Sequence, residues 1–308
     1  MVPHLSHHMK GVLFVGAAAV AWSLGGLFFR AIALDPWTTS FWRSIFAAAF
    51  LACYALITHR RKGSAAPRGD LRHGLVVSLG IAASMATFLP ALALTSVANV
   101  ALIYATAPIL TAVLAYFWLR EQLDGVTVIC ALGVVLGAAL LLSSSGQSYG
   151  IGGDLLAFAS TAALVLVALA IRARPGYSLL PYVCLANVLV AAIALPLAPS
   201  LAISWLDVAL LALFAFLQVA LSFTLFTVGA RMLPAKETAL INALEGPLSP
   251  LWVWLAFGEQ PSPSTMVSGV IIMTAVFAHI VIAARRQERD HSKYPQPSPP
   301  FRLTVQEQ

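Results

Sequence analysis

Long uninterrupted apolar runs constrain the fold of this chain more than any other feature of its sequence. Ten such runs follow one another along the 308 residues, and each is 17 to 22 residues long. A helix needs about 20 apolar residues to cross a bilayer core of about 30 Å, whereas the strands of a membrane β-barrel show short alternating segments. The runs therefore predict an all-α membrane protein with ten transmembrane helices. They are residues 11–29, 37–58, 74–94, 97–118, 125–143, 155–171, 179–196, 208–229, 238–257 and 264–284.

The composition excludes a water-soluble fold. Hydrophobic residues make up 60% of the chain and charged residues 10%, whereas soluble domains average about 45–50% and about 25%. Too few polar side chains remain to cover a soluble surface, so soluble enzymes, nucleic-acid-binding proteins and disordered scaffolds are excluded despite a net charge of +6. The segments between the runs are too short to fold alone. Any function must therefore lie within the helix bundle.

The two ends of the chain differ from the bundle between them. Residues 1–10 pass directly into a full-length apolar run, so we expect a retained cytosolic N-terminus rather than a cleaved leader. Residues 285–308 are charged and then proline-rich, which is typical of a disordered cytosolic tail. Between these ends we expect two units of five helices each, residues 11–143 and 155–284.

The distribution of Lys and Arg predicts the orientation in the membrane, because the cytosolic loops of membrane proteins carry an excess of these residues. If the N-terminus is cytosolic, sixteen of the eighteen Lys and Arg residues fall in cytosolic segments. Of the other two, Arg30 falls in an outer loop and Arg43 lies within a run. We therefore expect both termini in the cytosol and the protein in the inner (plasma) membrane.

The two halves of the chain are weakly similar at a shift of 138 residues. This shift aligns residues 100–103 with residues 238–241, and Glu121-Gln122 with Glu259-Gln260, without a gap. Each half contains five runs, an odd number, so the second half must be inverted in the membrane relative to the first. Inverted repeats are typical of secondary transporters, in which the two halves open the site to each side of the membrane in turn. The alternative is that apolar helices resemble one another by default.

Several short motifs resemble those of a known family. They are Arg43 in the second run, Leu119-Arg120-Glu121 after the proline-containing fourth run, Leu244-Glu245-Gly246-Pro247 in the ninth run, and Phe257-Gly258-Glu259 at its end. Together with the two five-helix repeats, they resemble the EamA type of the drug/metabolite transporter superfamily over residues 11–284. The resemblance implies export of amino acids and other small metabolites, and it includes inner-membrane exporters of aromatic amino acids. Its motifs indicate the family better than the substrate.

The sequence contains no motif for catalysis or for nucleotide hydrolysis. It has no phosphate-binding Gly-x-x-x-x-Gly-Lys-Ser/Thr loop and no His/Cys pattern with metal-ligand spacing. Cys53, Cys130 and Cys184 lie on three separate runs, where cysteine is expected as a small packing residue. We therefore expect no enzyme activity, no cofactor and no metal.

What remains is a secondary transporter that binds a small-molecule substrate within the lipid bilayer and exports it by alternating access. Amino acids are the substrates that we expect, and no nucleic-acid partner is expected. A monomer is feasible, and the oligomeric state stays open. Two alternatives are a channel or facilitative pore for small solutes and a transporter of a drug or of a metabolite other than an amino acid.

Glu245 is the strongest candidate for the substrate site. Glu245 and Arg43 are the two formally charged residues within the ten runs, and a charge near the bilayer centre is costly unless it has a function or a partner. At helical spacing Glu245 shares a face with Asn242, Ser249 and Trp252. Such a polar stripe on a buried helix is expected to face a cavity, although a structural Glu bonded to a neighbouring helix gives the same pattern.

Arg43 and a set of polar and aromatic residues are weaker candidates for the cavity wall. Arg43 lies about 9 Å into its run at 1.5 Å per residue, where it can either face a cavity or extend to the lipid headgroups. Tyr104 and Thr111 recur at helical spacing in the fourth run, a pattern that packing alone also produces. The other candidates are Trp22, Asn187 and Gln218.

Prolines mark the expected hinges. A proline cannot donate to the carbonyl four residues earlier, and it bends or breaks a helix. Pro108 and Pro247 lie near the middle of the fourth and ninth runs, which correspond in the proposed repeat, and Pro90 and Pro250 predict further breaks. The alternative is that these prolines only reflect the higher proline content of membrane helices.

The predicted orientation can be tested with a reporter that fluoresces only in the cytosol. Fused after Ala284, the reporter should fluoresce, because ten crossings return the chain to the cytosol. The measurement is whole-cell fluorescence normalised to the amount of fusion protein. A dark fusion that is present at normal levels would contradict the inverted-repeat arrangement.

Overall fold

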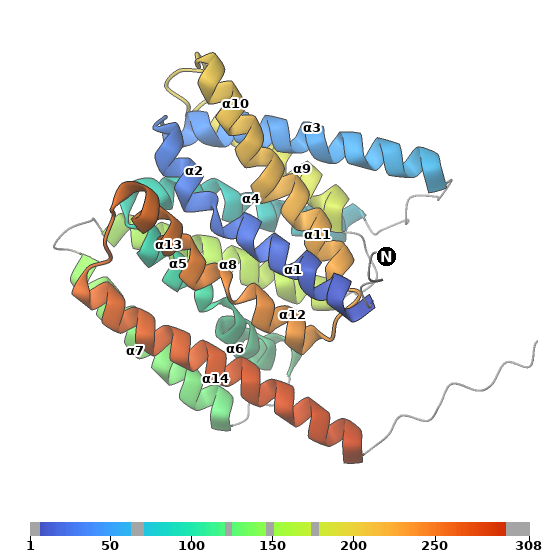
Figure 1. The fold of residues 1–308 in the computed structure, drawn as a ribbon, viewed down its shortest axis with the longest axis vertical. Helices are drawn as coiled ribbons and strands as arrows, with labels where there is room; N and C mark the ends of the chain where they lie inside the picture. Colours follow the sequence, from blue (N-terminus) through green and yellow to red (C-terminus); the bar gives the residue numbers. More distant parts are fainter. Residues whose placement is uncertain (1–6, 63–70, 121–124, 146–150, 174–178, 294–308) are drawn as a thin grey trace, which may run out of the picture.

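The computed structural model describes residues 7–62, 71–120, 125–145, 151–173 and 179–293. Within these ranges helices are the only regular elements (Figure 1). Eight helical segments there are long and apolar enough to cross a membrane. Large apolar side chains such as Leu56, Phe117 and Leu136 are exposed on the outside of the bundle, as is required of a surface that faces lipid tails. The chain is therefore a multi-pass, all-helical membrane protein.

The helices follow the predicted runs, but several runs fold as two or three consecutive helical pieces. One of these pieces, η1, is a π-helical turn between two α-helices. The elements are α1 (His7–Ser23), α2 (Gly25–Ile32), α3 (Pro36–Lys62), α4 (Leu71–Leu94), α5 (Val97–Ala105), α6 (Ala107–Leu119), α7 (Gly125–Ser145), α8 (Ile151–Ala173), α9 (Leu179–Ala194), α10 (Trp205–Phe214), η1 (Ala215–Leu221), α11 (Ser222–Gly229), α12 (Ala235–Asn242), α13 (Glu245–Phe257) and α14 (Pro263–Lys293).

Two of the ten predicted spans are not among the eight. The run 179–196 folds as α9, which is only 16 residues long because the chain turns just before Pro196, a residue that cannot continue a helix. The run 238–257 is divided between α12 and α13 at residues 243–244. The count of ten crossings therefore stays a prediction, whereas length and composition support eight in the described part of the chain.

Two of the interrupted spans break just before a proline. Pro108 is the second residue of α6, after a break at Thr106, and Pro247 is the third residue of α13, after a break at residues 243–244. Because proline lacks an N–H and its ring clashes with the preceding turn, it favours a break before both positions. In contrast, α4 and α13 continue through Pro90 and Pro250, so the breaks expected at these two prolines do not form.

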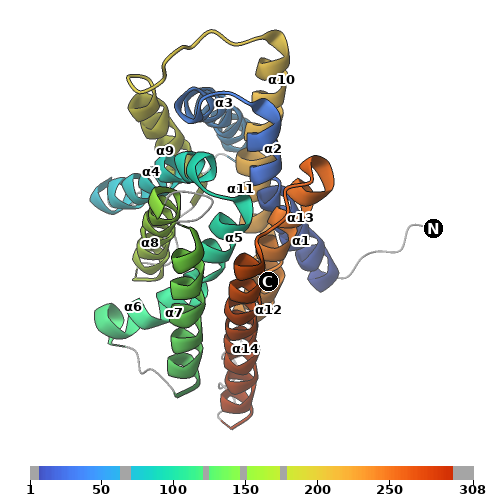
Figure 2. The same cartoon turned by 90° about the vertical axis from the view of Figure 1, so that its left-hand side faces the viewer.

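Helices that are distant in the sequence pack against each other in pairs. α4 packs along α8, and α1 packs along α11, while α3 pairs with α9, α7 with α14 and α5 with α13. Figures 1 and 2 show α7 and α14 side by side along one edge of the bundle. Each pair joins the first half of the chain to the second, so the two halves interlock closely.

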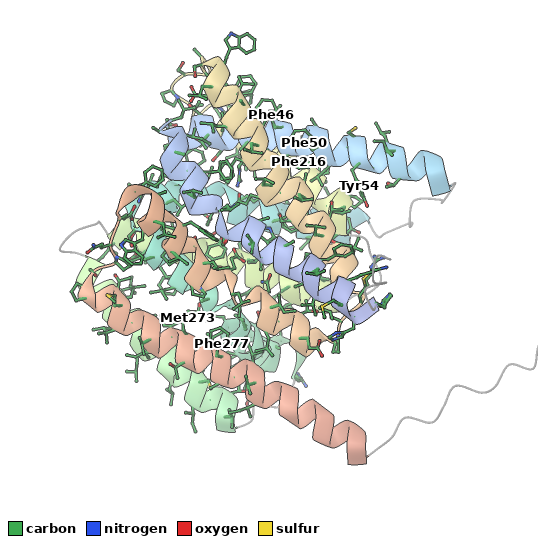
Figure 3. The ribbon with its side chains drawn as sticks, in the orientation of Figure 1. Phe46, Phe50, Tyr54, Phe216, Met273 and Phe277 are labelled. Atoms are coloured by element: carbon green, nitrogen blue, oxygen red, sulfur yellow. The ribbon has the colours of Figure 1, made fainter. Side chains whose placement is uncertain are left out.

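Small and aromatic side chains fill the space between α3, α9 and η1. Ala47 and Leu51 of α3 share a buried cluster with Ala186 of α9, and small residues at such positions let membrane helices approach closely. On the same side of the bundle, the rings of Phe50 (α3) and Phe216 (η1) meet edge to face, with their centroids 5.5 Å apart (Figure 3). This region of α3 is therefore held by packing on two neighbouring helices.

A buried polar network fastens one end of the bundle. Asp154, which is fully buried in the first turn of α8, accepts a hydrogen bond of 2.6 Å from the Thr95 hydroxyl and one of 3.3 Å from the Asn99 amide. The Thr265 hydroxyl of α14 in turn donates to Oδ1 of Asn99 at 3.0 Å. Buried polar groups stabilise a fold when they are bonded in this way. The network joins α5, α8 and α14 at the turn between α4 and α5.

A partly buried ion pair lies beside this network. Nε of Arg30 (α2) donates to Oε2 of Glu259 at 3.0 Å, and Nη2 of Arg30 reaches Oε1 of the same carboxylate at 3.4 Å. This two-point arrangement is the bidentate geometry that arginine forms with carboxylates. Because Nη2 also reaches the carbonyl of Thr95 at 3.4 Å, the pair ties α2 and the α13–α14 connection to the same end of the bundle.

Gly153 tests the close packing at this end, and Gly152 is its matched control. A Cβ at position 153 would lie 2.6 Å from the carbonyl carbon of Leu94 and 2.7 Å from the backbone nitrogen of Thr95, whereas a Cβ at position 152 meets nothing within 4 Å. We expect Gly153→Ala to push α8 from the α4–α5 turn and to destabilise the fold by about 1–3 kcal/mol. Gly152→Ala should be neutral or slightly stabilising. The measurement is the midpoint of thermal unfolding in detergent, and equal midpoints for the two variants would contradict the contact.

Candidate functional site

A cavity of about 490 Å³ lies between the two spans that break before a proline. Residues on both sides of each break line it, and α1, α4, α8, α11 and α14 complete the wall, which is mostly apolar. Its size falls in the range of about 300–1,000 Å³ that is typical of sites for small organic molecules. The polar side chains in the wall are Tyr104, Thr111, Thr238, Asn242, Glu245 and Ser249, and the aromatic ones besides Tyr104 are Trp22, Phe88 and Phe226.

Glu245 carries the only formal charge among the described residues that line the cavity. It is the first residue of α13, directly after the break, where the orphan N–H groups of a helix start favour a negative charge. Its carboxylate takes part in neither of the two ion pairs of the described residues, His8–Glu237 and Arg30–Glu259. A ligand in the cavity can therefore bind this carboxylate without displacing a protein group.

Tyr104 is held in place by two serines. Its hydroxyl forms a short hydrogen bond with Oγ of Ser160 and one of 3.3 Å with Oγ of Ser84, and the two serines bond each other at 3.1 Å. Its ring meets Phe88 edge to face, with centroids 5.4 Å apart. These contacts give Tyr104 a fixed position in the wall of the cavity that Glu245 also lines.

The other polar residues of the wall differ in how free they are to bind a ligand. The hydroxyl of Thr111 donates to the carbonyl of Ala107 at 2.7 Å, and that of Thr238 donates to the carbonyl of Pro234 at 3.2 Å. Both hydroxyls thus use their proton within their own segment. Oδ1 of Asn242, in contrast, is buried without a partner among the described residues. Asn242 and Glu245 flank the break in the α12–α13 span and are the two groups most available to a ligand.

The aromatic wall is built from α1, α4 and α11. Trp22 packs against Phe223 and Phe226, with ring centroids 5.2 Å apart in both cases. Aromatic faces bind apolar and cationic groups alike. The cavity therefore combines a negative group and an amide at one break with flat apolar surfaces around it.

Arg43 and Gln218, two residues that the sequence suggested for the cavity, lie together outside it. Arg43 is only 2% exposed, and its Nη1 donates to Oε1 of Gln218 at 2.8 Å. The guanidinium lies over the ring of Phe214, 5.3 Å from its centroid. Because these partners hold the side chain inside the bundle, Arg43 does not extend to the surface in this conformation.

Trp252 and Asn187 also lie outside the cavity. Nε1 of Trp252 donates to Oγ of Ser23 at 2.9 Å and so links α13 to α1. Asn187 is fully buried, and its amide donates to the carbonyl of Val183 within α9. Of the residues proposed from the sequence, the cavity thus brings together Glu245, Asn242, Ser249, Tyr104, Thr111 and Trp22, with Pro108 beside them.

The sequence missed the part of the wall that comes from α4 and α8. Phe88 lines the cavity, and Ser84 and Ser160 orient Tyr104. A phenylalanine or a serine in an apolar run carries no distinguishing signal, so their roles depend on which helices pack together. Within the described ranges, no three His, Cys, Asp or Glu side chains come together as metal ligands would.

Comparison with known proteins places this geometry in a family context. Residues 9–143 match the EamA-like transporter family, which agrees with the resemblance found in the sequence. Among curated proteins no sequence matches the chain.

The fold is similar to that of a solved protein whose title reads "Crystal structure of protein". The similarity has a TM-score of 0.65 at 18% sequence identity, and it covers 90% of this chain and 98% of that one. At this identity the likeness concerns the fold alone. It extends well beyond residues 9–143, so the second half of the chain also follows a known arrangement.

Cysteine labelling tests which residues face the cavity. In a Cys53→Ser background, Ala239→Cys should react rapidly with a water-soluble maleimide, because Ala239 lines the cavity and is exposed. Val253→Cys is the matched control on the following helix, since Val253 is 1% exposed and should stay unlabelled. The measurement is the labelled fraction of purified protein by mass spectrometry. Slow labelling at both positions would contradict a water-accessible cavity.

Proposed function

We propose that this chain is a secondary transporter that exports small organic metabolites, with amino acids as the expected class, across the inner membrane by alternating access. The observation that carries the proposal is the cavity between two broken helices, with an unpaired carboxylate at one of the breaks. Broken membrane helices whose ends face a central cavity are a recurring way to build a transporter site. The match of residues 9–143 to a transporter family supports the same reading.

An internal two-fold relation of the halves supports alternating access. α5 and α12 begin at residues 97 and 235, and α6 and α13 begin at 107 and 245, which is the shift of 138 found in the sequence. The packing pairs also exchange under this relation, because α4 on α8 becomes α11 on α1, while α3–α9 and α7–α14 map onto themselves. Two equivalent halves can exchange conformations and so open one site to either side.

A carrier fits the structure better than an open channel does. Val97 lines the cavity. Thr95 and Asn99 are two residues before and after it in the chain, and both belong to the buried polar network. In this proposal the network and the Arg30–Glu259 pair close the cavity at that end. A channel needs a continuous polar pore, whereas the wall of this cavity is mostly apolar. In the proposed orientation the closed end faces outward, and both chain termini are cytosolic.

The cavity favours substrates that combine an amine with an apolar or aromatic body. The carboxylate of Glu245 suits an ammonium group, Oδ1 of Asn242 can accept one of its protons, and Trp22 offers a flat surface. Amino acids with apolar or aromatic side chains meet this description. A drug or a metabolite with an amine but no carboxylate meets it too and is the alternative substrate.

The proposal is tested by counterflow in proteoliposomes with the Glu245→Gln variant. Unlabelled amino acid inside the vesicles should accelerate uptake of the labelled compound by the wild-type chain. Glu245→Gln keeps the shape but loses a charge-assisted hydrogen bond worth about 1.5–3 kcal/mol, so the KM for amine-bearing solutes should rise by about tenfold or more. If Glu245 also carries a proton, the variant should lose uptake driven by a pH gradient but keep exchange.

Glu237→Gln is the matched control for this experiment. Glu237 lies on α12, in the same broken span, but it pairs with His8 at 2.6 Å and does not line the cavity. Its variant should transport like the wild type. Flux without counterflow would favour the channel, and wild-type behaviour of Glu245→Gln would remove Glu245 from the site.

A further inference from the structure

Arg43 is a buried positive charge for which the described part of the protein supplies no negative partner. Its side chain is 2% exposed, and its one hydrogen bond is the bond from Nη1 to the neutral amide of Gln218. Nε and Nη2 are buried and have no partner among the described residues. Leaving a buried charge unpaired costs several kcal/mol. A group that neutralises Arg43 is therefore missing from the described protein atoms.

The acidic residues whose side chains the structure describes are committed elsewhere. Asp154 belongs to the polar network, and Glu245 lines the cavity without an ion pair to Arg43. The other four of this group cap a helix or form an ion pair: Asp35 at the start of α3, Asp207 at the start of α10, Glu237 with His8 and Glu259 with Arg30.

Arg30 shows which kind of group the Nε–Nη2 edge of the Arg43 guanidinium can bind. In Arg30, Nε and Nη2 bind the two oxygens of the Glu259 carboxylate. In Arg43 the same two nitrogens are the ones without a partner. This edge of a guanidinium binds a carboxylate or another compact anion through two parallel hydrogen bonds. Arg43 thus presents an anion-binding edge inside the bundle.

The surroundings of Arg43 add further polar groups that have no partner. Thr39 and Ser40 lie on the same stripe of α3 as Arg43, four and three residues before it, and Ser44 follows it directly. A side-chain oxygen of each of these three residues is buried without a hydrogen-bond partner among the described residues. Ser78 of α4 and Asn187 of α9, on helices that pack on α3, carry buried oxygens of the same kind. Unsatisfied buried polar atoms beside a buried charge are unusual for a native core and indicate a polar ligand or water.

Two neighbours fix Arg43 and prevent it from turning toward lipid. Gln218 belongs to the π-helical turn η1, a feature that is frequent at functional sites. Gly25 leaves room for Gln218, because a Cβ at Gly25 would lie 2.2 Å from Nε2 of that side chain. The ring of Phe214 lies under the guanidinium. The positive charge is therefore held in place, as expected of a binding group.

We propose that Arg43, with the unpartnered polar groups beside it on α3, forms a second subsite that binds a compact monovalent anion. The anion is either the carboxylate of the transported substrate or a free ion such as chloride. The first source rests on the proposed transport function, and the second does not. The subsite lies near the cavity wall, since Gln218, the partner of Arg43, and the wall residue Phe88 both approach Gly25.

Anion binding is measured on the purified full chain in lipid nanodiscs, with radiolabelled chloride and with thermal unfolding in chloride, formate or gluconate at equal ionic strength. Chloride and formate are compact and should raise the unfolding temperature of the wild type, whereas gluconate is too bulky to enter. Arg43→Met should weaken chloride binding by about tenfold or more, because charge-assisted hydrogen bonds are lost. Arg43→Lys keeps the charge and should restore part of the binding. Arg30→Gln is the matched control and should bind chloride like the wild type, since Glu259 fills the edge of Arg30.

The transport arm distinguishes the two sources of the anion. Phenylalanine and phenethylamine differ only by the carboxylate. If that carboxylate occupies the subsite, Arg43→Met should raise the KM for phenylalanine by about tenfold and leave the KM for phenethylamine unchanged. If a free ion occupies it, the KM values should change together, and chloride should stabilise the wild type without substrate.

The proposal fails if the wild type responds equally to chloride, formate and gluconate and if Arg43→Met leaves the KM for phenylalanine unchanged. Counterflow that persists in that case would leave the transport function standing. If Arg43→Met does not fold, the anion titration of the wild type and of the Arg43→Lys variant tests whether the subsite binds anions. Chloride binding by a chain that shows no counterflow would support the subsite and contradict the transport function.

Discussion

In a lipid bilayer every backbone N–H and carbonyl needs a partner within the protein, and this constraint determines where the chain can be irregular. The breaks at Thr106 and at residues 243–244 are tolerated because they open onto a cavity instead of lipid. Pro108 and Pro247 cannot donate to the carbonyls of Tyr104 and Ala243, and both of these residues line that cavity. The position of the candidate site thus follows from the position of the prolines.

The same low-dielectric interior makes each buried charge informative. Arg30 and Glu259 satisfy each other, and Asp154 is bonded by Thr95 and Asn99, so these residues hold the bundle together at the α4–α5 turn. Arg43 and Glu245 have no ion-pair partner among the described residues. Burying them unpaired gains no stability, and their requirement for a counter-charge is the physical reason for assigning ligand-binding roles to them.

The sequence identifies residues that are anomalous in an apolar run, but it does not show which neighbours they meet. Glu245 and Pro108 are recognisable because a charge and a proline disturb a membrane helix, and both line the cavity. Arg43 is as unusual in an apolar run as Glu245, yet it contacts Gln218 and does not line the cavity. The packing of helices against each other decides which residues a side chain contacts, and the spacing along one helix does not show it. The prediction that Trp252 shares a face with Asn242 assumes one continuous helix. The break between α12 and α13 interrupts that helix. Phe88 could not be found, since phenylalanine is ordinary in such a run.

Two buried groups of opposite charge would determine what the proposed site selects. Glu245 and Arg43 do not form an ion pair with each other in this conformation. A solute that supplies a counter-charge removes a desolvation cost that the empty protein already bears, so it gains binding energy beyond its buried area. The apolar residues of the wall form no directional bonds with a solute, so they accept solutes of different shapes. Selection at such a site therefore depends on the charge pattern of the solute more than on its outline.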